Sequence, residues 1–395
     1  MKTSSKCIHI WPEDISVVNG IVTVNFTIES QEIPRTLLWY RLPDQYESDI
    51  TRTCDPLVVG ILFKAMRTSS DIIVHGTASP SLLVNLGEFN AAWSDWLPDR
   101  FSNINIYAEE EKEGSQADTS AHVAAFSGGV DGAFTIWRHR TGQGVNRQRN
   151  IQAGLLVHGF DIPLGWEEDF NNAYRKSRIM LKSVGLDLIP VKTNLEIMWH
   201  DWLDVHHART AILASCLMLL QRKFSAGIIG SSFPYNHLIL PMHSNPITDR
   251  FLSSDSFKII HDSAEFSRFE KLRYLLNWSD ALKYLRVCER NDHRDSNCCR
   301  CEKCVRTILS YRILGIGLPE CFDNDVSDGE ILKLVYPRET PLYYFKEVIQ
   351  EAKKASISEP WVRALEFSLL INRVGYKAKQ VTTFRNLYQF ASRNP

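Results

Sequence analysis

The feature that most constrains the fold is a regular alternation of short apolar runs and amphipathic runs that begins at His122. The apolar runs have the length and the glycine or polar boundaries of strands that are buried on both faces. Strands that alternate with helices in this way imply a parallel sheet covered by helices on both faces. The expected strands are HVAAFS, AGLLVHGF, DLIPVKT and AGIIGSS, and the expected helices are DGAFTIWRHRTG, WEEDFNNAYRKSRIMLKSVG and HHARTAILASCLMLLQRKF.

The first 110 residues have a different pattern of apolar and polar residues. The stretch ISVVNGIVTVNFTIES alternates apolar and polar residues around Asn-Gly, which predicts a β-hairpin. TLLWYRLP and DIIVHGTAS are expected to be strands, and PLVVGILFKAMRT and LLVNLGEFNAAWSDWL to be helices. The charged stretch that follows predicts a linker. We therefore expect an N-terminal α+β domain over 1–110, a linker over 111–120, an α/β domain over 121–320 and a helical C-terminal extension over 321–395.

Composition narrows the functional classes. The chain has 395 residues and a formal net charge of -1, so no basic field argues for nucleic-acid binding. The first residues lack the apolar region of a signal peptide, and the longest apolar helical run, AILASCLMLL, is too short to span a bilayer. We expect a cytoplasmic protein without membrane contact. Disulfides seldom persist in that compartment, yet the chain has nine cysteines, five of them between Cys288 and Cys304, which favours a metal site.

Ligands of parallel α/β sheets bind at the carboxyl ends of the strands. Three predicted strands end in Ser127–Gly132, His158–Asp161 and Gly230–Ser232. In the first of these, glycines allow backbone N–H groups to point into one concavity at the start of a helix, an arrangement that favours phosphate. The alternative is a plain strand-to-helix turn in which Asp131 caps the helix. The stretch is neither a Walker A loop nor a dinucleotide fingerprint, because the required Gly-Lys-Ser/Thr and third glycine are missing.

The cysteine cluster has the spacing of a metal knuckle. Cys298, Cys301 and Cys304 are separated by two-residue gaps, and Cys288 can supply a fourth thiolate. Four thiolates in this pattern suit a tetrahedral zinc site, and the alternatives are an iron–sulfur cluster or reduced surface cysteines without a metal. Cys299, inside the knuckle, is left over and is expected to be inert.

The stretch SGGVDG resembles the pyrophosphate-binding loop of the PP-loop ATP pyrophosphatases, written S-G-G-x-D-S. Members of that family cleave ATP to AMP and pyrophosphate while adenylating a carbonyl or carboxylate oxygen. The knuckle resembles that of the 7-cyano-7-deazaguanine synthase (QueC) branch, whose pattern is a lone Cys followed by Cys-Gly-x-Cys-x-x-Cys. Gly132 replaces the usual serine of the loop, and Cys299 replaces the usual glycine of the knuckle. The resemblance covers residues 122–315, and the rest of the chain has no counterpart.

The resemblance implies a site that binds ATP and Mg²⁺ beside a structural Zn²⁺. Its catalytic residues would be Asp131, Asp161 and Arg209, although for Arg209 a solvated or ion-paired side chain is the alternative. Weaker candidates for contact with substrate or Mg²⁺ lie in the long polar segment before Leu272: His243, Asp249, Arg250, His261 and Asp262. The implied ATP-binding residues are Ser127, Gly128, Gly129, Val130, Asp131, Gly132, His158, Gly159, Phe160, Gly230 and Ser231; the implied zinc ligands are Cys288, Cys298, Cys301 and Cys304.

The implied activity is ATP-dependent adenylation of a small carboxylate, a 7-deazapurine acid, followed by attack of a nitrogen nucleophile in a C–N ligase reaction. The nucleophile would be ammonia or an amine, and the extra N-terminal domain allows a partner protein as acceptor. One alternative is a degenerate PP-loop that serves as a nucleotide-binding scaffold in a multi-protein complex of the antiviral defence type. Another is a sulfur-transfer relative that uses Cys216 or Cys299.

Overall fold

The computed structural model describes residues 6–199, 202–288, 292–335 and 339–372. They form two compact units, Met1–Ser267 and Arg268–Pro395. The boundary between these units falls inside the predicted domain over 121–320, and residues 111–120 lie within the first unit. No helix in the described ranges is both long and apolar enough to cross a membrane.

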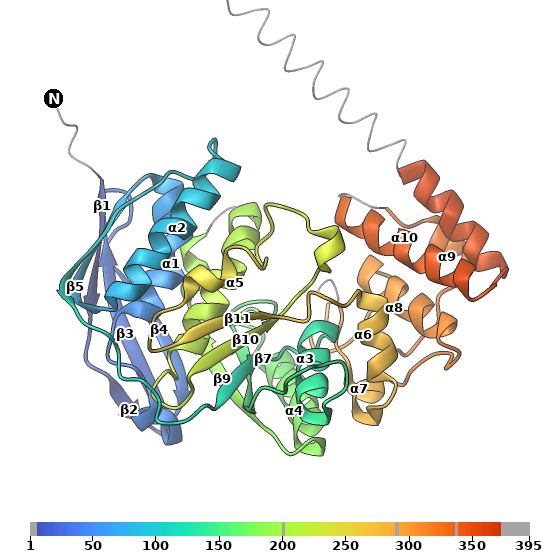
Figure 1. Ribbon diagram of the computed structural model, residues 1–395, viewed down its shortest axis with the longest axis horizontal. Coiled ribbons are helices and arrows are strands. Elements are labelled where there is room, and N and C mark those ends of the chain that lie inside the picture. The colour runs from blue at the N-terminus through green and yellow to red at the C-terminus, as the bar shows by residue number, and fades with distance from the viewer. Residues whose placement is uncertain (1–5, 200–201, 289–291, 336–338, 373–395) are drawn as a thin grey trace, which may run out of the picture. The chain divides into compact units, whose positions relative to one another are not determined.

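The first unit is built on one sheet of eleven strands (Figure 1). The order across the sheet is β11-β10-β7-β8-β9-β4-β3-β1-β5-β6, and β2 pairs with β3. The strands are β1 (Cys7–Pro12), β2 (Ser16–Val18), β3 (Ile21–Glu29), β4 (Thr36–Pro43), β5 (Asp71–Ala78), β6 (Ile106–Glu111), β7 (His122–Ala125), β8 (Ile151–His158), β9 (Asp187–Thr193), β10 (Ala226–Gly230) and β11 (Lys258–Asp262).

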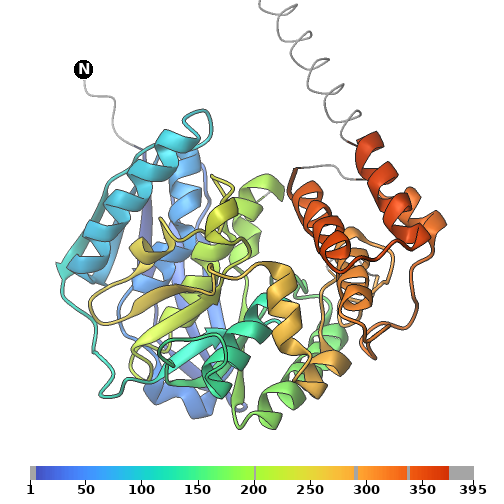
Figure 2. The same cartoon turned by 45° about the vertical axis from the view of Figure 1, so that its right-hand side comes forward.

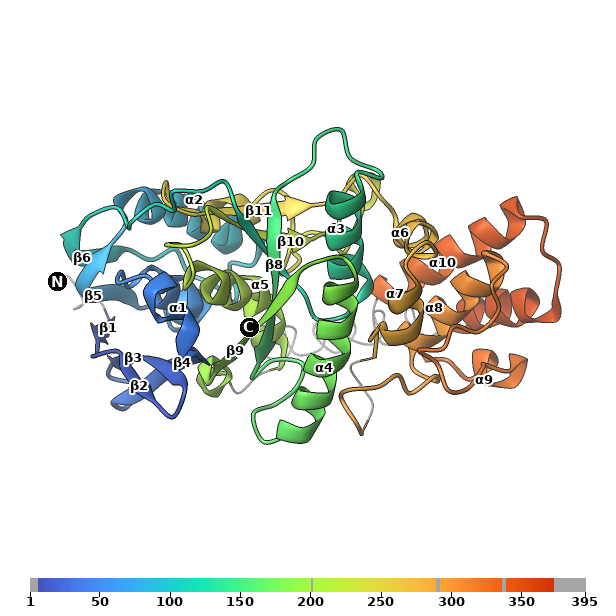
Figure 3. The same cartoon turned by 90° about the horizontal axis from the view of Figure 1, so that it is seen from below.

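One half of this sheet, from β11 to β9, is entirely parallel. Its strands β7, β8, β9 and β10 were predicted from the sequence, whereas β11 lies in the stretch that was expected to be a long polar segment. Its helices are α3 (Val130–Thr141), α4 (Glu167–Ser183) and α5 (Trp202–Met218). Right-handed crossovers place α5 on the face opposite α3 and α4, as Figure 3 shows. The chain moves outward from β7 through β8 to β9 and then returns to β10, so the strand order reverses between β7 and β10. Ligands of doubly wound sheets bind at such a reversal.

The other half of the sheet, with α1 (Asp55–Thr68) and α2 (Pro80–Trp96), contains the predicted N-terminal elements. The expected hairpin is present, with Asn19 and Gly20 in the left-handed region. The first residues of the charged stretch form β6, which pairs with β5, whereas residues 112–120 have no regular structure. The acidic side chains of β6 point mainly to solvent, and the backbone still completes the sheet edge.

Antiparallel pairing of β4 with β9 joins the two halves. Asn194, directly after β9, extends this contact: its Oδ1 accepts from the Trp39 amide at 2.8 Å, and its Nδ2 donates to the Leu37 carbonyl at 3.0 Å. The Thr193 hydroxyl donates to the Trp39 carbonyl at 2.9 Å. The N-terminal residues therefore share one continuous sheet with the α/β residues.

The second unit is helical in its described residues (Figure 2). The described knuckle cysteines lie in this unit, between α7 and the first turn of α8. A further helical stretch covers residues 360–372, and the basic tail from Lys377 lies outside the described residues. The helices are α6 (Arg268–Leu275), α7 (Ser279–Tyr284), α8 (Glu302–Ile313), α9 (Asp328–Leu332) and α10 (Glu339–Lys354).

We predict that Asn194→Ala lowers the free energy of unfolding by about 2 kcal/mol, because it leaves the Trp39 amide and the Leu37 carbonyl without their side-chain partner. Urea denaturation followed by circular dichroism measures this change. Asn171→Ala makes the same substitution at an exposed position of α4 and should change stability by less than about 0.5 kcal/mol. Equal stabilities of the two variants would contradict the structural role of Asn194.

Candidate functional site

The glycine turn leaves β7 at the reversal of strand order. Ser127 is exposed, Gly128 is buried with φ +76°, and Gly129 is the extended N-cap residue of α3. The first amides of an α-helix have no carbonyl four residues before them, and the helix dipole makes this end positive. Asp131 is half-buried in the first turn, and its side chain is not the N-cap. The turn therefore has the backbone form of an anion cradle.

The first turn of α3 lies unusually close to the ends of two strands. A Cβ on Gly132 would lie 2.9 Å from the carbonyl oxygen of Ala125, at the end of β7. A Cβ on Gly230, at the end of β10, would lie 2.7 Å from the carbonyl oxygen of Asp131. Both positions therefore require glycine for space rather than for an unusual φ. The serine expected at position 132 does not fit unless the helix moves away from β7.

The side chain at the end of β8 packs inside the protein. His158 is fully buried: its Nε2 donates to the Pro163 carbonyl at 3.0 Å, and its ring stacks on Phe170. Burial lowers the pKa of His158, so the imidazole is held neutral. Gly159 has φ +107°, and a Cβ there would lie 2.1 Å from the Thr193 carbonyl oxygen. The side chain of His158 is thus used in packing, and the Gly159 amide donates to the Ile162 carbonyl at 3.0 Å, which closes the turn that follows β8.

Two predicted catalytic residues lie together. Nη1 of Arg209 on α5 is 3.0 Å from Oδ1 of Asp161, and both side chains are about one-third exposed. Glu196, in the 3₁₀ turn η2 (Leu195–Met198), completes a charged group with them. Burial raises the pKa of Glu196 to about 7; Arg209 opposes this rise and Asp161 adds to it. A carboxyl group with a pKa near 7 beside an ion pair is typical of functional sites.

The loop after β10 is fixed by Ser231. The Ser231 amide donates to the Asp262 carbonyl at 2.7 Å, and the buried hydroxyl donates to the Phe233 carbonyl at 2.6 Å. Both the amide and the hydroxyl of Ser231 therefore hold the turn, and the structure does not direct either of them at a phosphate.

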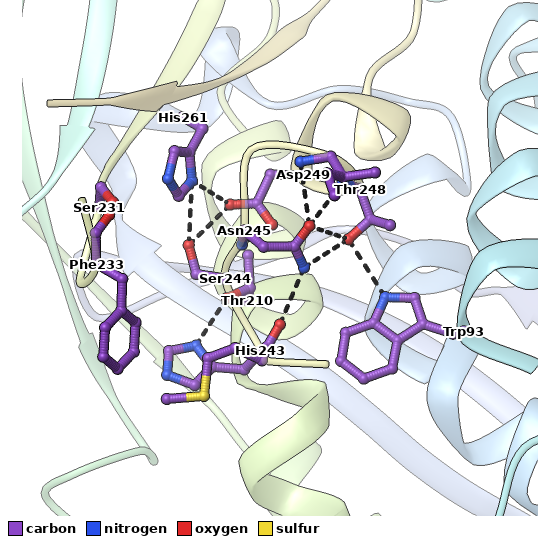
Figure 4. Close-up of polar contacts among 12 residues, drawn as sticks. Trp93, Thr210, Ser231, Phe233, His243, Ser244, Asn245, Thr248, Asp249 and His261 are labelled. Atoms are coloured by element: carbon purple, nitrogen blue, oxygen red, sulfur yellow. Dashed lines mark hydrogen bonds and ion pairs between the residues drawn. The ribbon is translucent and has the colours of Figure 1, made fainter. Parts of the chain in front are cut away.

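A dense hydrogen-bond network orders the segment between β10 and β11 (Figure 4). Oδ1 of Asn245 accepts from the Thr248 amide, and the Asn245 amide donates to Asp249. Asp249 also accepts from Ser244 at 2.8 Å and pairs with Nδ1 of His261 at 2.8 Å. Elsewhere in the segment, Nδ1 of His243 lies 3.1 Å from the Thr210 hydroxyl on α5. These contacts give Asp249 protein partners on both oxygens, so its carboxylate orders the loop.

Asp262 has a comparable structural role on the other face of β11. Its carboxylate accepts from His139 at 3.0 Å and from Thr135 at 3.2 Å. Burial favours the neutral acid, but the His139 hydrogen bond and the Arg138 guanidinium outweigh burial and hold the pKa of Asp262 below its usual value. Arg250, the remaining weak candidate, is exposed.

Four cysteines of the second unit, Cys288, Cys298, Cys301 and Cys304, bring their sulfurs within 4.8 Å of one another. The sulfurs of Cys288 and Cys301 are 3.7 Å apart, and those of Cys298 and Cys304 are 4.0 Å apart. A regular tetrahedron with Zn–S bonds of about 2.3 Å has S–S edges of about 3.8 Å. Hydrogen bonds from the neighbouring thiols, Cys288 foremost, lower the pKa of Cys298. The predicted cluster is therefore assembled and could hold a metal ion such as zinc.

Asn297 connects the two parts of this cluster. Its Oδ1 accepts from the amides of Val287 and Cys288, and its Nδ2 donates to the carbonyls of Leu285 and Cys321. Sequence reasoning missed this residue, because a single Asn before a cysteine carries no signal of its long-range partners.

Cys299 occupies the position at which the resembled knuckle has glycine. It has φ +60°, in the left-handed region that favours glycine. Burial raises the pKa of its thiol, and its sulfur lies 3.5 Å from the Asn297 carbonyl oxygen. Cys299 is therefore a poor nucleophile.

No protein-family model, curated protein or solved structure matches the chain. The chemistry of the site therefore rests on its own residues. The glycine turn and the four cysteines were visible as local motifs. Glu196 was missed because its environment is set by the ion pair between Arg209 on α5 and Asp161 in the loop after β8.

We predict that Gly132→Ala destabilises the protein by about 1 kcal/mol or more, because its Cβ meets the backbone of β7. Gly87→Ala is the matched control: Gly87 lies in α2 with nothing within 4 Å of an added Cβ, so alanine there should stabilise by up to about 1 kcal/mol. Thermal unfolding compares the two variants. Stabilisation by both substitutions would rule out a tight contact at Gly132.

For the cysteine cluster we expect one zinc ion per chain, measured by mass spectrometry of metals after purification without chelators. Cys298→Ser should lose the metal, whereas Cys299→Gly and Cys299→Ala should keep it. Cys299→Gly should be more stable than Cys299→Ala by about 1 kcal/mol, because only glycine relieves the left-handed backbone. Loss of metal in either Cys299 variant would make this residue a ligand and would contradict the four-sulfur assignment.

Proposed function

We propose that the chain is a PP-loop ATP pyrophosphatase that adenylates a small carboxylate and transfers the acyl group to a nitrogen nucleophile. The observation that carries the proposal is the glycine turn at the reversal of strand order, with α3 seated directly against β7 and β10. This contact would direct the N-terminus of α3 at the edge of the sheet where a phosphate can bind. The resemblance of SGGVDG to the family loop narrows the phosphate to ATP pyrophosphate.

The roles of the residues follow from their positions. Backbone N–H groups of Gly128, Gly129 and the first turn of α3 would hold the β- and γ-phosphates. Asp131 would hold Mg²⁺, which neutralises phosphate charge when bound. The substrate carboxylate would attack the α-phosphate and release pyrophosphate, a step that depends on positioning and charge stabilisation. The four cysteines would hold a structural zinc ion.

Arg209, beside Asp161 and Glu196, would bind the carboxylate of the substrate. The guanidinium already pairs with Asp161, and Glu196, whose pKa is raised to about 7, is only about half-ionised at pH 7. An incoming carboxylate can therefore share Arg209 without facing two full negative charges. The family resemblance names a 7-deazapurine acid as the substrate class and ammonia or an amine, including one on a partner protein, as the nucleophile.

A second candidate is a nucleotide-binding scaffold in a multi-protein complex of the antiviral defence type. Gly132, which removes a hydroxyl from the loop, favours this alternative. Sulfur transfer ranks lower, because burial raises the pKa of both Cys216 and Cys299. A thiol of raised pKa is a weak nucleophile.

The test is pyrophosphate release from ATP with a 7-deazapurine carboxylic acid. We expect release by the wild type and a loss of at least about 100-fold in Asp131→Ala, which removes the ligand for the phosphate-bound cation. Asp118→Ala removes the same charge from an exposed position outside the turn and should leave the rate unchanged. A wild type that binds ATP but releases no pyrophosphate with the acid would instead support the scaffold.

A further inference from the structure

Strand β11 carries two buried histidine–aspartate pairs, one on each face of the sheet. His261 pairs with Asp249 at 2.8 Å, and the next residue, Asp262, pairs with His139 at 3.0 Å. All four side chains are at most 6% exposed. Adjacent residues of a strand point to opposite faces, so the two pairs are independent of each other.

The two histidines differ in one respect. His139 uses both ring nitrogens: Nε2 bonds Asp262, and Nδ1 accepts from the Arg149 amide at 3.1 Å. His261 uses Nδ1 for Asp249 and Ser244, whereas its Nε2 is buried and has no hydrogen-bond partner in the described residues. Buried polar atoms are nearly always paired, so this nitrogen needs an explanation.

The partners of Asp249 fix which nitrogen of His261 carries the proton. Asp249 is 1% exposed and accepts from Ser244 and from the Asn245 amide as well as from the ring. A carboxylate held in this way accepts a hydrogen bond from Nδ1–H of His261, so the proton stays on Nδ1 and Nε2 has a lone pair. The same division of roles activates a histidine base in hydrolases, where the carboxylate orients the ring and the far nitrogen accepts the proton.

The position of His261 relates it to the proposed site. It is the penultimate residue of β11 and pairs in register with Ile229 of β10, so Ser231 continues along the same face. Figure 4 shows Ser231 and Phe233 on the side of the His261 ring away from Asp249. Two strand spacings, about 10 Å, separate β11 from the glycine turn after β7. An ATP molecule held at the turn by its β- and γ-phosphates would extend its α-phosphate, and with it the acyl carbon, across that distance toward β11.

We propose that His261 is the proton acceptor for the nitrogen nucleophile in the second half of the reaction, an inference that rests on the proposed function. The nitrogen lone pair forms a bond to the acyl carbon of the acyl-adenylate. The C–O bond to AMP breaks, and AMP leaves with that electron pair. The proton displaced from the nitrogen passes to Nε2 of His261, and Asp249 stabilises the imidazolium through Nδ1.

The experiment separates the two half-reactions in the full-length protein with a 7-deazapurine carboxylic acid. Pyrophosphate release measures adenylation, and product formation from ammonium or from hydroxylamine measures transfer. In His261→Ala we expect pyrophosphate release within about threefold of wild type and transfer to ammonium reduced by about 100-fold or more. Hydroxylamine is a stronger nucleophile that needs less help from a base. Transfer to hydroxylamine should therefore be nearly as fast in His261→Ala as in the wild type. Added imidazole should restore transfer to ammonium.

His139→Ala is the matched control, because it opens the same kind of buried pair on the opposite face of β11. His139→Ala should change the rates of pyrophosphate release and of transfer in the same proportion. Added imidazole should not restore either rate. Loss of both half-reactions in His261→Ala without rescue would assign His261 a structural role and overturn this inference alone. Ammonium transfer in the wild type no faster than in the variant would also overturn it. Absence of pyrophosphate release in the wild type would instead reject the proposed function itself.

Discussion

The close contact of α3 with the ends of β7 and β10 is the constraint on which the proposed site depends. Only residues without a Cβ allow the carbonyl groups of Ala125 and Asp131 to come so near positions 132 and 230. Protein interiors are packed too tightly to absorb an extra carbon at such points without a backbone shift. The direction of the helix, and therefore of its first amides, is thus set by the backbones of two strands rather than by a capping side chain.

Local pattern predicted most of the elements of the first unit, because strand and helix periodicity are short-range properties. The joining of the two halves into one sheet was not predicted. It depends on the antiparallel pairing of β4 with β9 and on the side chain of Asn194, which extends that pairing with hydrogen bonds to residues more than 150 positions away in the chain. A polar, charged segment such as 108–120 looks like a linker in sequence, yet its beginning supplies backbone for β6. The composition of this segment therefore predicted the irregular stretch over 112–120, but it did not predict where the two compact units divide.

The candidate site divides in the same way. Its motif residues were predicted from spacing, and the structure places them at strand ends or in one sulfur cluster. Glu196 and Asn297 were not predicted, because an ordinary Glu or Asn acquires its role only from partners that folding brings to it. Ser231 and His158 show the converse: both stand at predicted positions, but their side chains are bonded within their own loops.

The two departures from the resembled family have backbone explanations of opposite kinds. At Gly132 a side chain is missing where the structure has no space for one, whereas at Cys299 a side chain is present where the backbone favours glycine. The missing hydroxyl of Gly132 is thus coupled to the tight contact between α3 and β7. That contact holds the N-terminal amides of α3 at the sheet edge, where backbone N–H groups can bind a phosphate without a side-chain hydroxyl. The lost hydroxyl of Gly132 favours the scaffold and the retained backbone amides favour turnover, so the choice between enzyme and scaffold depends on whether pyrophosphate is released.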